Sequence, residues 1–337
     1  MNIPTNFWDK FLINKRNKYS LLIFIVIFVL SLIAEIVSND KPIVLMMDDK
    51  LYFPIVISYT DKEFGGYFDT EADYKDEFIT SRLQEEYNWA IFPINPHSYD
   101  SINISQSTPN PASPSTHNYL GTDDRGRDVL ARLIYGFRLS VLFAFALTAI
   151  GIFIGIFFGA IQGYFAGRVD LFMQRFIEIW SSMPELYILI IFSSLFEPSI
   201  FLLIILLSLF GWMSLSDYVR AEFLKGRNME YVIAARTLGL SNTKIILKHI
   251  LPNSMVSVIT FLPFRISGAI LILTSLDFLG LGVPPDTPSL GELLAQGKEN
   301  IEAWWLSLST FLVLVGTLLM LIFIGEGIRE SLDSRSS

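Results

Sequence analysis

The sequence predicts an all-α integral membrane protein with a small extracytoplasmic insert. Hydrophobic residues make up 52% of the chain, and the mean hydropathy is +0.47. Several nearly uncharged stretches reach the length of about 20 residues that a helix needs to cross a bilayer. One long acidic segment separates the first of these stretches from the others. Lipid is therefore the expected main solvent of this chain.

We expect about six membrane-spanning helices, because six stretches meet this length requirement. They cover residues 19–38, 139–165, 172–196, 199–217, 254–280 and 303–325. The first stretch stays apolar as far as Val37, and no small-residue cleavage pattern follows it. We therefore expect it to remain as an anchor and not to be removed as a signal peptide.

Basic residues in the short connecting segments predict the orientation, because such residues favour the cytoplasmic side. They precede the first stretch, flank the turn between the second and third, and crowd the connection between the fourth and fifth. These residues are Lys10, Lys15, Arg16, Lys18, Arg168, Arg175, Arg220, Lys225, Arg227, Arg236, Lys244 and Lys248. Both termini, including the tail 331–337, are expected to be cytoplasmic.

Residues 39–116 form the expected extracytoplasmic insert and its linker. Segment 39–137 holds 16 acidic and 8 basic residues, so 8 − 16 gives −8, the net charge of the whole chain. Residues 41–100 combine β-leaning runs with a Phe64-Gly-Gly66 turn, which indicates a small folded unit. Residues 104–116 are rich in Ser, Thr, Asn and Pro and predict a linker. The chain has no cysteine, which excludes disulfides and Cys-ligated metals.

Two features of the expected core 117–330 stand out. Residues 120–136 are dense in both charges, which predicts an ion-paired rim beside the second span. Glycines recur every fourth residue in that span and predict a flat groove for a neighbouring helix. The groove is either a packing seam inside the subunit or a seam that moves or faces another subunit. The glycines are Gly151, Gly155, Gly159, Gly163 and Gly167.

Charged residues inside the predicted spans are candidates for a translocation path, because they are costly in lipid without a partner or an aqueous cavity. Pro184 should kink the third span. Glu178 and Glu185 lie seven residues apart, which places them on one face of a continuous helix. Arg265 and Asp277 in the fifth span are too far around the helix to pair directly. For these four charges, structural pairing or an interfacial position and pore lining are both open.

The polar segment 222–252 between the fourth and fifth spans predicts a helix-turn-helix in the cytoplasm. Tyr231, Ala235 and Leu238 fall at i, i+4 and i+7 and suggest one apolar stripe. Gly239 should end the first helix in a left-handed conformation, and Ser241 can cap the second. Pro252 marks the return to the membrane.

This segment resembles the EAA loop of ABC importer permeases, whose short coupling helix sits in a cleft of the ATPase subunit. The resemblance rests on Ala234-Ala235, Gly239 and Ile250-Leu251-Pro252, whereas Ile233 stands where the family usually has Glu. Glu230 could serve the helix N-terminus in its place. The coupling residues that the resemblance implies are Glu230, Tyr231, Ala234, Ala235, Arg236, Leu238, Gly239, Leu251 and Pro252.

Motifs on both sides of this loop resemble the dipeptide, oligopeptide and nickel permease family. They are His117, Leu120-Gly-Thr-Asp123, Gly126-Arg-Asp128, Tyr135-Gly136, Phe278-Leu-Gly-Leu-Gly-Val-Pro-Pro285 and Pro288-Ser-Leu-Gly291. Others resemble the branch linked to uptake of microcin C and other peptides. These are Leu51-Tyr-Phe-Pro54, Phe64-Gly-Gly66, Met183-Pro-Glu-Leu-Tyr187, Leu276-Asp-Phe-Leu-Gly280, Gly291-Glu-Leu-Leu-Ala-Gln-Gly297 and Phe323-Ile-Gly-Glu326.

The resemblance implies the type I ABC importer permease fold in a bacterial inner membrane, with the large loop in the periplasm. It also implies four kinds of partner: a homologous permease subunit forming a heterodimer, two cytoplasmic ABC ATPase domains, an extracytoplasmic solute-binding protein and membrane lipid. No cofactor, metal or nucleic acid is expected. The external insert either docks the binding protein or only stabilises the external face.

Two other functional classes account for parts of the sequence. An ion-coupled secondary transporter could use Glu178, Glu185 and Asp277 as proton relays, but it leaves the cytoplasmic loop without a role. A membrane enzyme is disfavoured, because His97, His117 and His249 are far apart and no nucleophile-base or metal-ligand spacing occurs. Residues 291–298 resemble a phosphate loop only superficially, since Glu299 stands where Ser or Thr is required.

Overall fold

The computed structural model describes residues 7–85, 87–102 and 109–332. The chain divides into two compact units. Unit 1 comprises Met1–Phe24, Ser140–Pro284 and Val315–Ser337, and unit 2 comprises Ile25–Leu139 and Pro285–Leu314. Each unit is described by itself.

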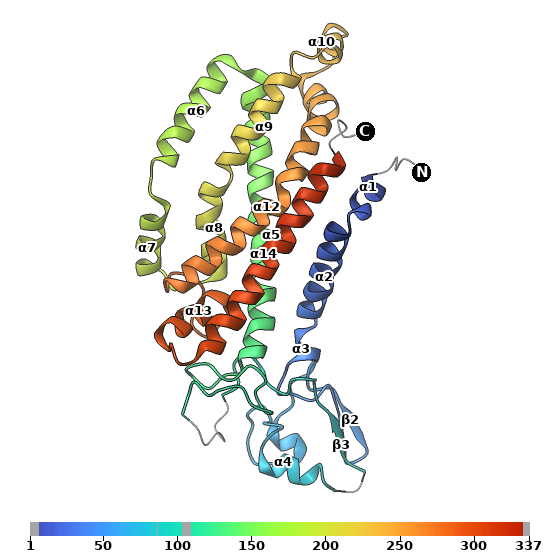
Figure 1. Cartoon of the computed structure of the whole chain (residues 1–337), viewed down its shortest axis with the longest axis vertical. Coiled ribbons are helices and arrows are strands. Elements are labelled where there is room, and N and C mark those ends of the chain that lie inside the picture. Colours follow the sequence, from blue (N-terminus) through green and yellow to red (C-terminus); the bar gives the residue numbers. More distant parts are fainter. Residues whose placement is uncertain (1–6, 86, 103–108, 333–337) are drawn as a thin grey trace. The chain divides into compact units, whose positions relative to one another are not determined.

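Helices dominate the chain (Figure 1). The first group is α1 (Phe7–Ile13), α2 (Lys15–Leu32), α3 (Ala34–Val37), α4 (Glu77–Arg82), α5 (Val129–Phe165), α6 (Gly167–Ser181) and α7 (Glu185–Leu195). The second group is α8 (Ile200–Gly211), α9 (Met213–Gly226), α10 (Glu230–Thr237), α11 (Asn242–Lys244), α12 (Leu251–Phe278), α13 (Leu290–Glu299) and α14 (Trp304–Leu332). One π-helical stretch, Ile245–Ile250, joins α11 to α12.

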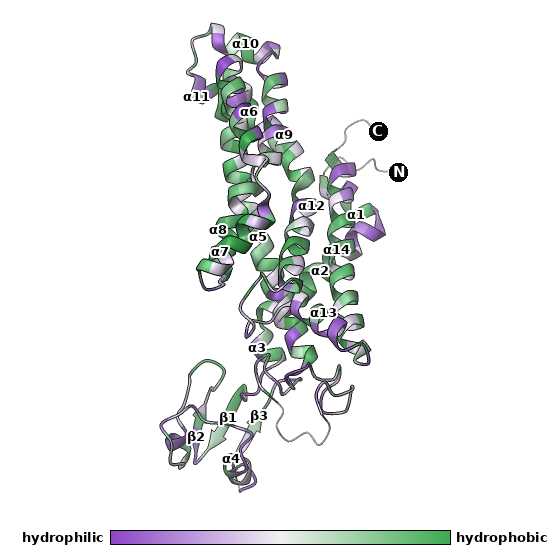
Figure 2. Cartoon of the chain, turned by 90° about the vertical axis from the view of Figure 1, so that its left-hand side faces the viewer, coloured by the Kyte–Doolittle hydropathy of each residue, from purple (hydrophilic) through white to green (hydrophobic). Residues whose placement is uncertain are grey.

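Among the described residues, four helical segments are long and apolar enough to cross a membrane: Val129–Phe165, Ile200–Gly226, Asn242–Phe278 and Trp304–Leu332. Figure 2 shows the hydrophobic character of α8. The bent pair α6 and α7 adds a fifth span if it is counted as one. The all-α membrane class is thus confirmed, whereas the predicted count of six is not. The predicted span 19–38 falls on α2 and α3, which are separated at Ile33.

The predicted kink at Pro184 is present, because α6 and α7 meet at an angle of 63°. Proline has no backbone N–H and cannot continue the hydrogen bonding of α6, so Pro184 becomes the residue before the first turn of α7. Glu178 therefore belongs to α6 and Glu185 to α7. The prediction that these carboxylates share one helix face is wrong, since it assumed an unbroken helix.

The insert in unit 2 is folded, as predicted. Strands β1 (Val44–Met47), β2 (Lys50–Tyr52) and β3 (Trp89–Ile91) form an antiparallel sheet in the order β2-β1-β3. Leu45 and Met47 on one side of β1 are buried with Phe64, Tyr74 and Ile79. Gly65 ends a short helical turn with φ +86°, a conformation that favours glycine.

An ion pair between Lys41 and Glu71 links two segments of the insert at its surface. The Lys41 ammonium, together with the Ser58 hydroxyl at 2.7 Å from Glu71 Oε1, lowers the pKa of the Glu71 carboxyl below its ordinary value. This pair ties the residues before β1 to the segment before α4.

The described part of the predicted linker, residues 109–116, is bonded to its neighbours. The Ala112 amide donates to Thr122 Oγ1 at 2.9 Å, and Ala112 O accepts from the Thr122 amide at 2.9 Å. Asn110 Oδ1 accepts a third bond from the Thr122 hydroxyl at 3.2 Å. Residues 104–108 of the linker lie outside the described residues.

Candidate functional site

The loop between α9 and α12, residues 222–252 and hereafter the coupling loop, is built on a buried apolar cluster. Val232 and Ala235 of α10 are 0% and 6% exposed and lie against Phe223, Ile245 and Ile250. The cluster joins α10 to the ends of the two membrane helices that carry it. The loop is therefore packed onto the membrane helices through a shared core and is not a free connection.

Gly239 ends α10 as the sequence predicts. Its φ is +79°, the left-handed conformation in which glycine is favoured. The Leu240 amide donates to Ala235 O at 3.2 Å and the Gly239 amide donates to Arg236 O at 3.0 Å. This pair of bonds is a Schellman motif, which satisfies helix-end carbonyls and reverses the chain. Ser241 precedes α11, but its side chain makes no capping bond there.

The residues of the predicted stripe, Tyr231, Ala235 and Leu238, differ in exposure. Ala235 points into the cluster, whereas Leu238 is 80% exposed and Tyr231 is 44% exposed. The Leu238 amide still donates to Ala234 O at 3.0 Å, so Leu238 continues the bonding of α10. The exposures differ because the cluster buries the side of the helix that carries Val232 and Ala235. The exposed large apolar residues of α10 and the following turns, hereafter the outer apolar residues, are Tyr231, Ile233, Leu238 and Leu247.

Polar contacts fix the loop to its supports. The Tyr164 hydroxyl at the end of α5 donates to Asn242 Oδ1 at 2.7 Å, and the Arg236 guanidinium lies 5.6 Å from the Tyr164 ring centroid. The side-chain amide of Asn253 donates to the Tyr231 hydroxyl at 3.1 Å. Of the other predicted coupling residues, Glu230, Ala234 and Pro252 are exposed and Leu251 is half-buried.

The glycines of α5 lie against α9. A Cβ added to Gly155 would lie 3.0 Å from Leu215 Cβ, and one added to Gly159 would lie 2.5 Å from Ser216 O. The closest approach is at Gly163, where a Cβ would lie 2.4 Å from Phe223 Cβ. Since Phe223 belongs to the coupling-loop cluster, this seam connects a membrane helix to the loop. Gly167, in contrast, has nothing within 4 Å.

Three of the four intramembrane charges have partners in unit 1. Glu178 pairs with Arg175 at 2.5 Å. Arg265 donates to the Gly211 carbonyl at 2.6 Å and to the Ser214 hydroxyl at 3.2 Å. Its cation thus lies at the C-terminus of α8, where helix carbonyls favour positive charge. A Cβ on Gly151 would lie 3.0 Å from this guanidinium, so the glycine leaves room for it.

Asp277 is also engaged. Its Oδ1 accepts from the Val283 amide at 2.8 Å, which closes the turn after α12. A Cβ on Gly282 would lie 1.7 Å from the same oxygen, so this glycine of the Phe278–Pro285 motif is required by the carboxylate. Glu185 differs from the other three, because no ion pair or hydrogen bond from its carboxylate occurs among residues 7–85, 87–102 and 109–332.

The predicted ion-paired rim is confirmed in unit 2. Asp123, Arg127 and Arg132 precede or begin α5, and Glu292 lies in the first turn of α13. Arg127 pairs with Asp123 at 2.6 Å and with Glu292 at 3.2 Å, and Arg132 pairs with Glu292. The side chains of Asp123 and Arg132 are 0% exposed and that of Arg127 is 4% exposed. We call these four residues the rim network.

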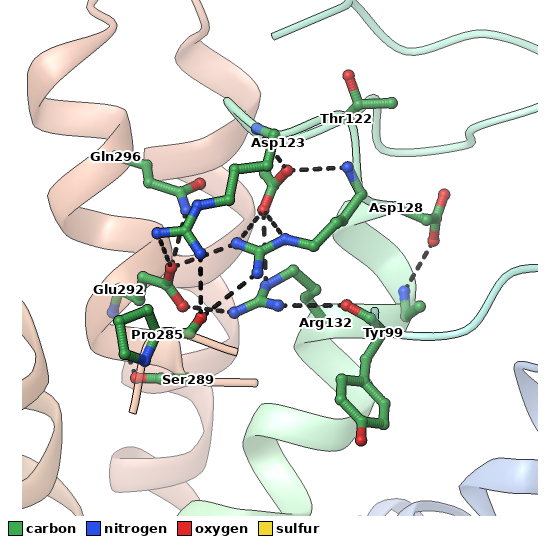
Figure 3. Close-up of polar contacts among 12 residues, drawn as sticks. Tyr99, Thr122, Asp123, Asp128, Arg132, Pro285, Ser289, Glu292 and Gln296 are labelled. Atoms are coloured by element: carbon green, nitrogen blue, oxygen red, sulfur yellow. Dashed lines mark hydrogen bonds and ion pairs between the residues drawn. The ribbon is translucent and has the colours of Figure 1, made fainter. Parts of the chain in front are cut away.

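The rim network also holds backbone carbonyls (Figure 3). Arg132 donates to Tyr99 O at 3.2 Å and to Thr287 O at 3.1 Å, and Arg127 donates to Pro285 O at 3.4 Å. Asp128 caps α5 by accepting from the Ala131 amide at 2.8 Å. The motifs 120–128 and 285–292 are therefore joined by charged side chains and carbonyls within one unit.

Sequence reasoning missed two parts of these sites. The pairing of Arg132 with Glu292 spans 160 residues, and neither local spacing nor periodicity signals such a contact. The second is the bend of α6 and α7, where Glu185 lines a pocket together with residues of α5, α8, α9 and α12. Pro184 predicted the bend, but it did not predict which helices surround the bend.

Comparisons with known proteins agree with this geometry. Residues 151–337 match the family described as "Binding-protein-dependent transport system inner membrane component". The chain is 48% identical to the inner membrane ABC transporter permease protein YejE of Escherichia coli (strain K12), over 97% of this chain and 95% of that protein. It is 45% identical to the peptidoglycan transport system permease protein YejE of Agrobacterium fabrum, over 98% and 92%.

A third relative, the oligopeptide transport system permease protein OppC of Haemophilus influenzae, is 37% identical over 71% of this chain and 77% of its own length. The family match covers α6 to α14 and the coupling loop, and the two YejE relatives extend the similarity across the insert. The chain therefore belongs to the inner membrane components of binding-protein-dependent transport systems.

Proposed function

We propose that this chain is the membrane-spanning permease subunit of an ATP-driven importer of peptides or peptide-like compounds, including compounds similar to microcin C. The relatives support the cargo class through their names, which describe ABC transporter, peptidoglycan and oligopeptide permeases. The subunit is not itself an enzyme, and ATP hydrolysis takes place in a separate partner.

The coupling loop is the observation that carries the mechanism. Its outer apolar residues are exposed although its core is complete, so they cannot be explained by the stability of this chain alone. A cleft on an ATPase domain would bury them. Motion of that domain would then pass through the buried cluster to α9 and α12, which enter the membrane region directly from the loop.

The remaining partners follow the same scheme. In our proposal a homologous permease subunit completes a heterodimer, two ATPase domains act in the cytoplasm, and a solute-binding protein delivers the peptide outside. The termini and coupling loop are placed in the cytoplasm and the insert in the periplasm, as the basic connecting segments suggest. The alternative of a proton-coupled transporter receives no support from the family, and Glu178 and Asp277 already have partners in this chain.

Leu238→Asp tests the coupling role. Leu238 is 80% exposed, so the substitution should leave membrane insertion and thermal stability unchanged. We expect ATPase co-purification and peptide uptake to be lost, because the charge would be buried without a partner in the docked state. Ile301→Asp is the matched control, since Ile301 is 84% exposed and lies outside the loop. Normal uptake by the Leu238 variant would refute the proposal.

A further inference from the structure

A pocket of about 400 Å³ lies at the bend between α6 and α7 in unit 1. Its walls are mostly apolar and come from α5, the bend, α8, α9 and α12; they include Leu147, Met183, Leu207, Phe210, Met213 and Ile272. Among the described residues that line it, Glu185, the first residue of α7, supplies the one carboxylate. Apolar walls with one charged group are the usual composition of a small-molecule site.

The carboxylate of Glu185 has no counter-charge in the part of the chain that the structure describes. Arg265 donates to the carbonyl of Gly211, a residue that lines the pocket, and to Ser214. The N-terminus of α7 offers a partial positive charge, worth about 0.3–1 kcal/mol at an exposed surface. That is much less than an ionised carboxylate needs in a membrane-spanning segment. The site therefore lacks one cation.

We propose that Glu185 binds a cationic group of the transported peptide, its α-ammonium or a basic side chain, while the peptide occupies this pocket. The inference rests on the proposed function and names a contact within it. An α-ammonium is common to unblocked peptides, whereas their side chains differ. The Glu185 carboxylate binds the shared α-ammonium, and the flexible side chains of Met183 and Met213 adapt to the differing side chains of the peptides.

The broken helix supports this assignment independently of the charge. Non-helical backbone within a membrane is tolerated where it is covered by protein or lines a cavity, and interrupted helices of transporters often surround the substrate. Here the interruption at Ser182–Pro184 lies between two lining residues, Ser181 and Glu185. Pro184 thus places the carboxylate at the pocket instead of inside a continuous helix.

The test uses the assembled transporter in lipid nanodiscs, without the binding protein, and compares trialanine with N-acetyl-trialanine. Glu185→Gln should weaken trialanine binding about tenfold or more, the factor expected for losing one charge-assisted hydrogen bond. Binding of the acetylated peptide should not change. Glu185→Asp should restore part of the trialanine affinity. Glu197→Gln, which alters an exposed carboxylate beyond the end of α7, should affect neither peptide.

Three results would overturn the inference. They are unchanged trialanine binding in Glu185→Gln, an equal loss of binding for both peptides in that variant, and loss of the homologous subunit when that variant is purified. The last result would mean that the Glu185 carboxylate pairs with a cation of the homologous subunit and not with the peptide. Failure of the proposed function gives a different result. In that case the unaltered transporter with its binding protein would take up no trialanine when ATP is supplied.

Discussion

The rim network and the coupling loop differ in whether their side chains find their partners within the chain. In the rim, Asp123, Arg127, Arg132 and Glu292 are largely buried and bonded to one another, so the interactions are complete within the chain. In the coupling loop, a complete apolar core lies beneath large apolar side chains that remain exposed. The rim interactions are satisfied within the chain, whereas the loop exposes apolar side chains that we propose a partner buries. Substitutions in the rim should therefore act on stability, and those on the outer loop should act on assembly.

The largest effect on stability is expected from Arg132→Met. Removing this guanidinium leaves Glu292 with fewer partners in a mostly buried site and should lower the free energy of unfolding by about 3–5 kcal/mol. Thermal unfolding of the purified protein measures it. Arg125→Met is the control, because Arg125 is 43% exposed and its nearest carboxylate oxygen is 3.7 Å away. If Arg132→Met and Arg125→Met lower the free energy of unfolding equally, the rim network contributes little to stability.

Gly163→Ala should have the next largest effect. The added methyl group would overlap Phe223 and the Arg220 carbonyl, which should cost about 1–3 kcal/mol. Gly316→Ala in α14 has open space and should be neutral or stabilising by about 0.5–1 kcal/mol, the usual gain for alanine in a helix. Thermal unfolding compares the pair. If both variants gain stability, the seam between α5 and α9 does not support the loop.

Gly239→Trp sharpens the comparison, because it should affect coupling more than stability. A side chain in the left-handed conformation costs about 1–2 kcal/mol, and the site has open space around it. Transport and ATPase docking should be abolished while membrane insertion is retained. Gly239→Asn, which tolerates this conformation better, should retain more activity. Uptake assays on membrane vesicles distinguish the two, and full uptake by the tryptophan variant would exclude the coupling role.

The smallest effect is expected at the insert surface. Because the folded-state pKa of Glu71 is lowered, its pairing with Lys41 stabilises the insert at pH values above about 4.5 and is lost as the pH falls through the lowered pKa. The Glu71 side chain is 43% exposed, so Glu71→Gln should cost at most about 1 kcal/mol at neutral pH. Hydrogen exchange of β1 at pH 7 and pH 3 checks this. Equal protection in the variant and the unaltered protein at pH 7 would contradict it.

Local patterns predicted some features better than others. Composition was sufficient for the membrane class, Pro184 for the bend, and Gly239 for the end of α10, because each depends on one residue or a short window. The stripe on α10 did not predict burial, because the apolar cluster buries the side of the helix that carries Val232 and Ala235 and leaves Tyr231 and Leu238 exposed. The contact of Arg132 with Glu292 could not be predicted, since tertiary folding alone brings these residues together. The same holds for the pocket around Glu185.

Site-specific cross-linking through Leu238 tests the central claim most directly. The chain contains no cysteine, so Leu238→Cys provides one reactive thiol in an otherwise natural sequence. In membranes that hold the complete transporter, a reagent with a maleimide at one end and a photoreactive benzophenone at the other should join it to the ATPase subunit on illumination, whereas Ile301→Cys should give no such product. Absence of an ATPase adduct at Leu238, or an equal yield at Ile301, would contradict the account.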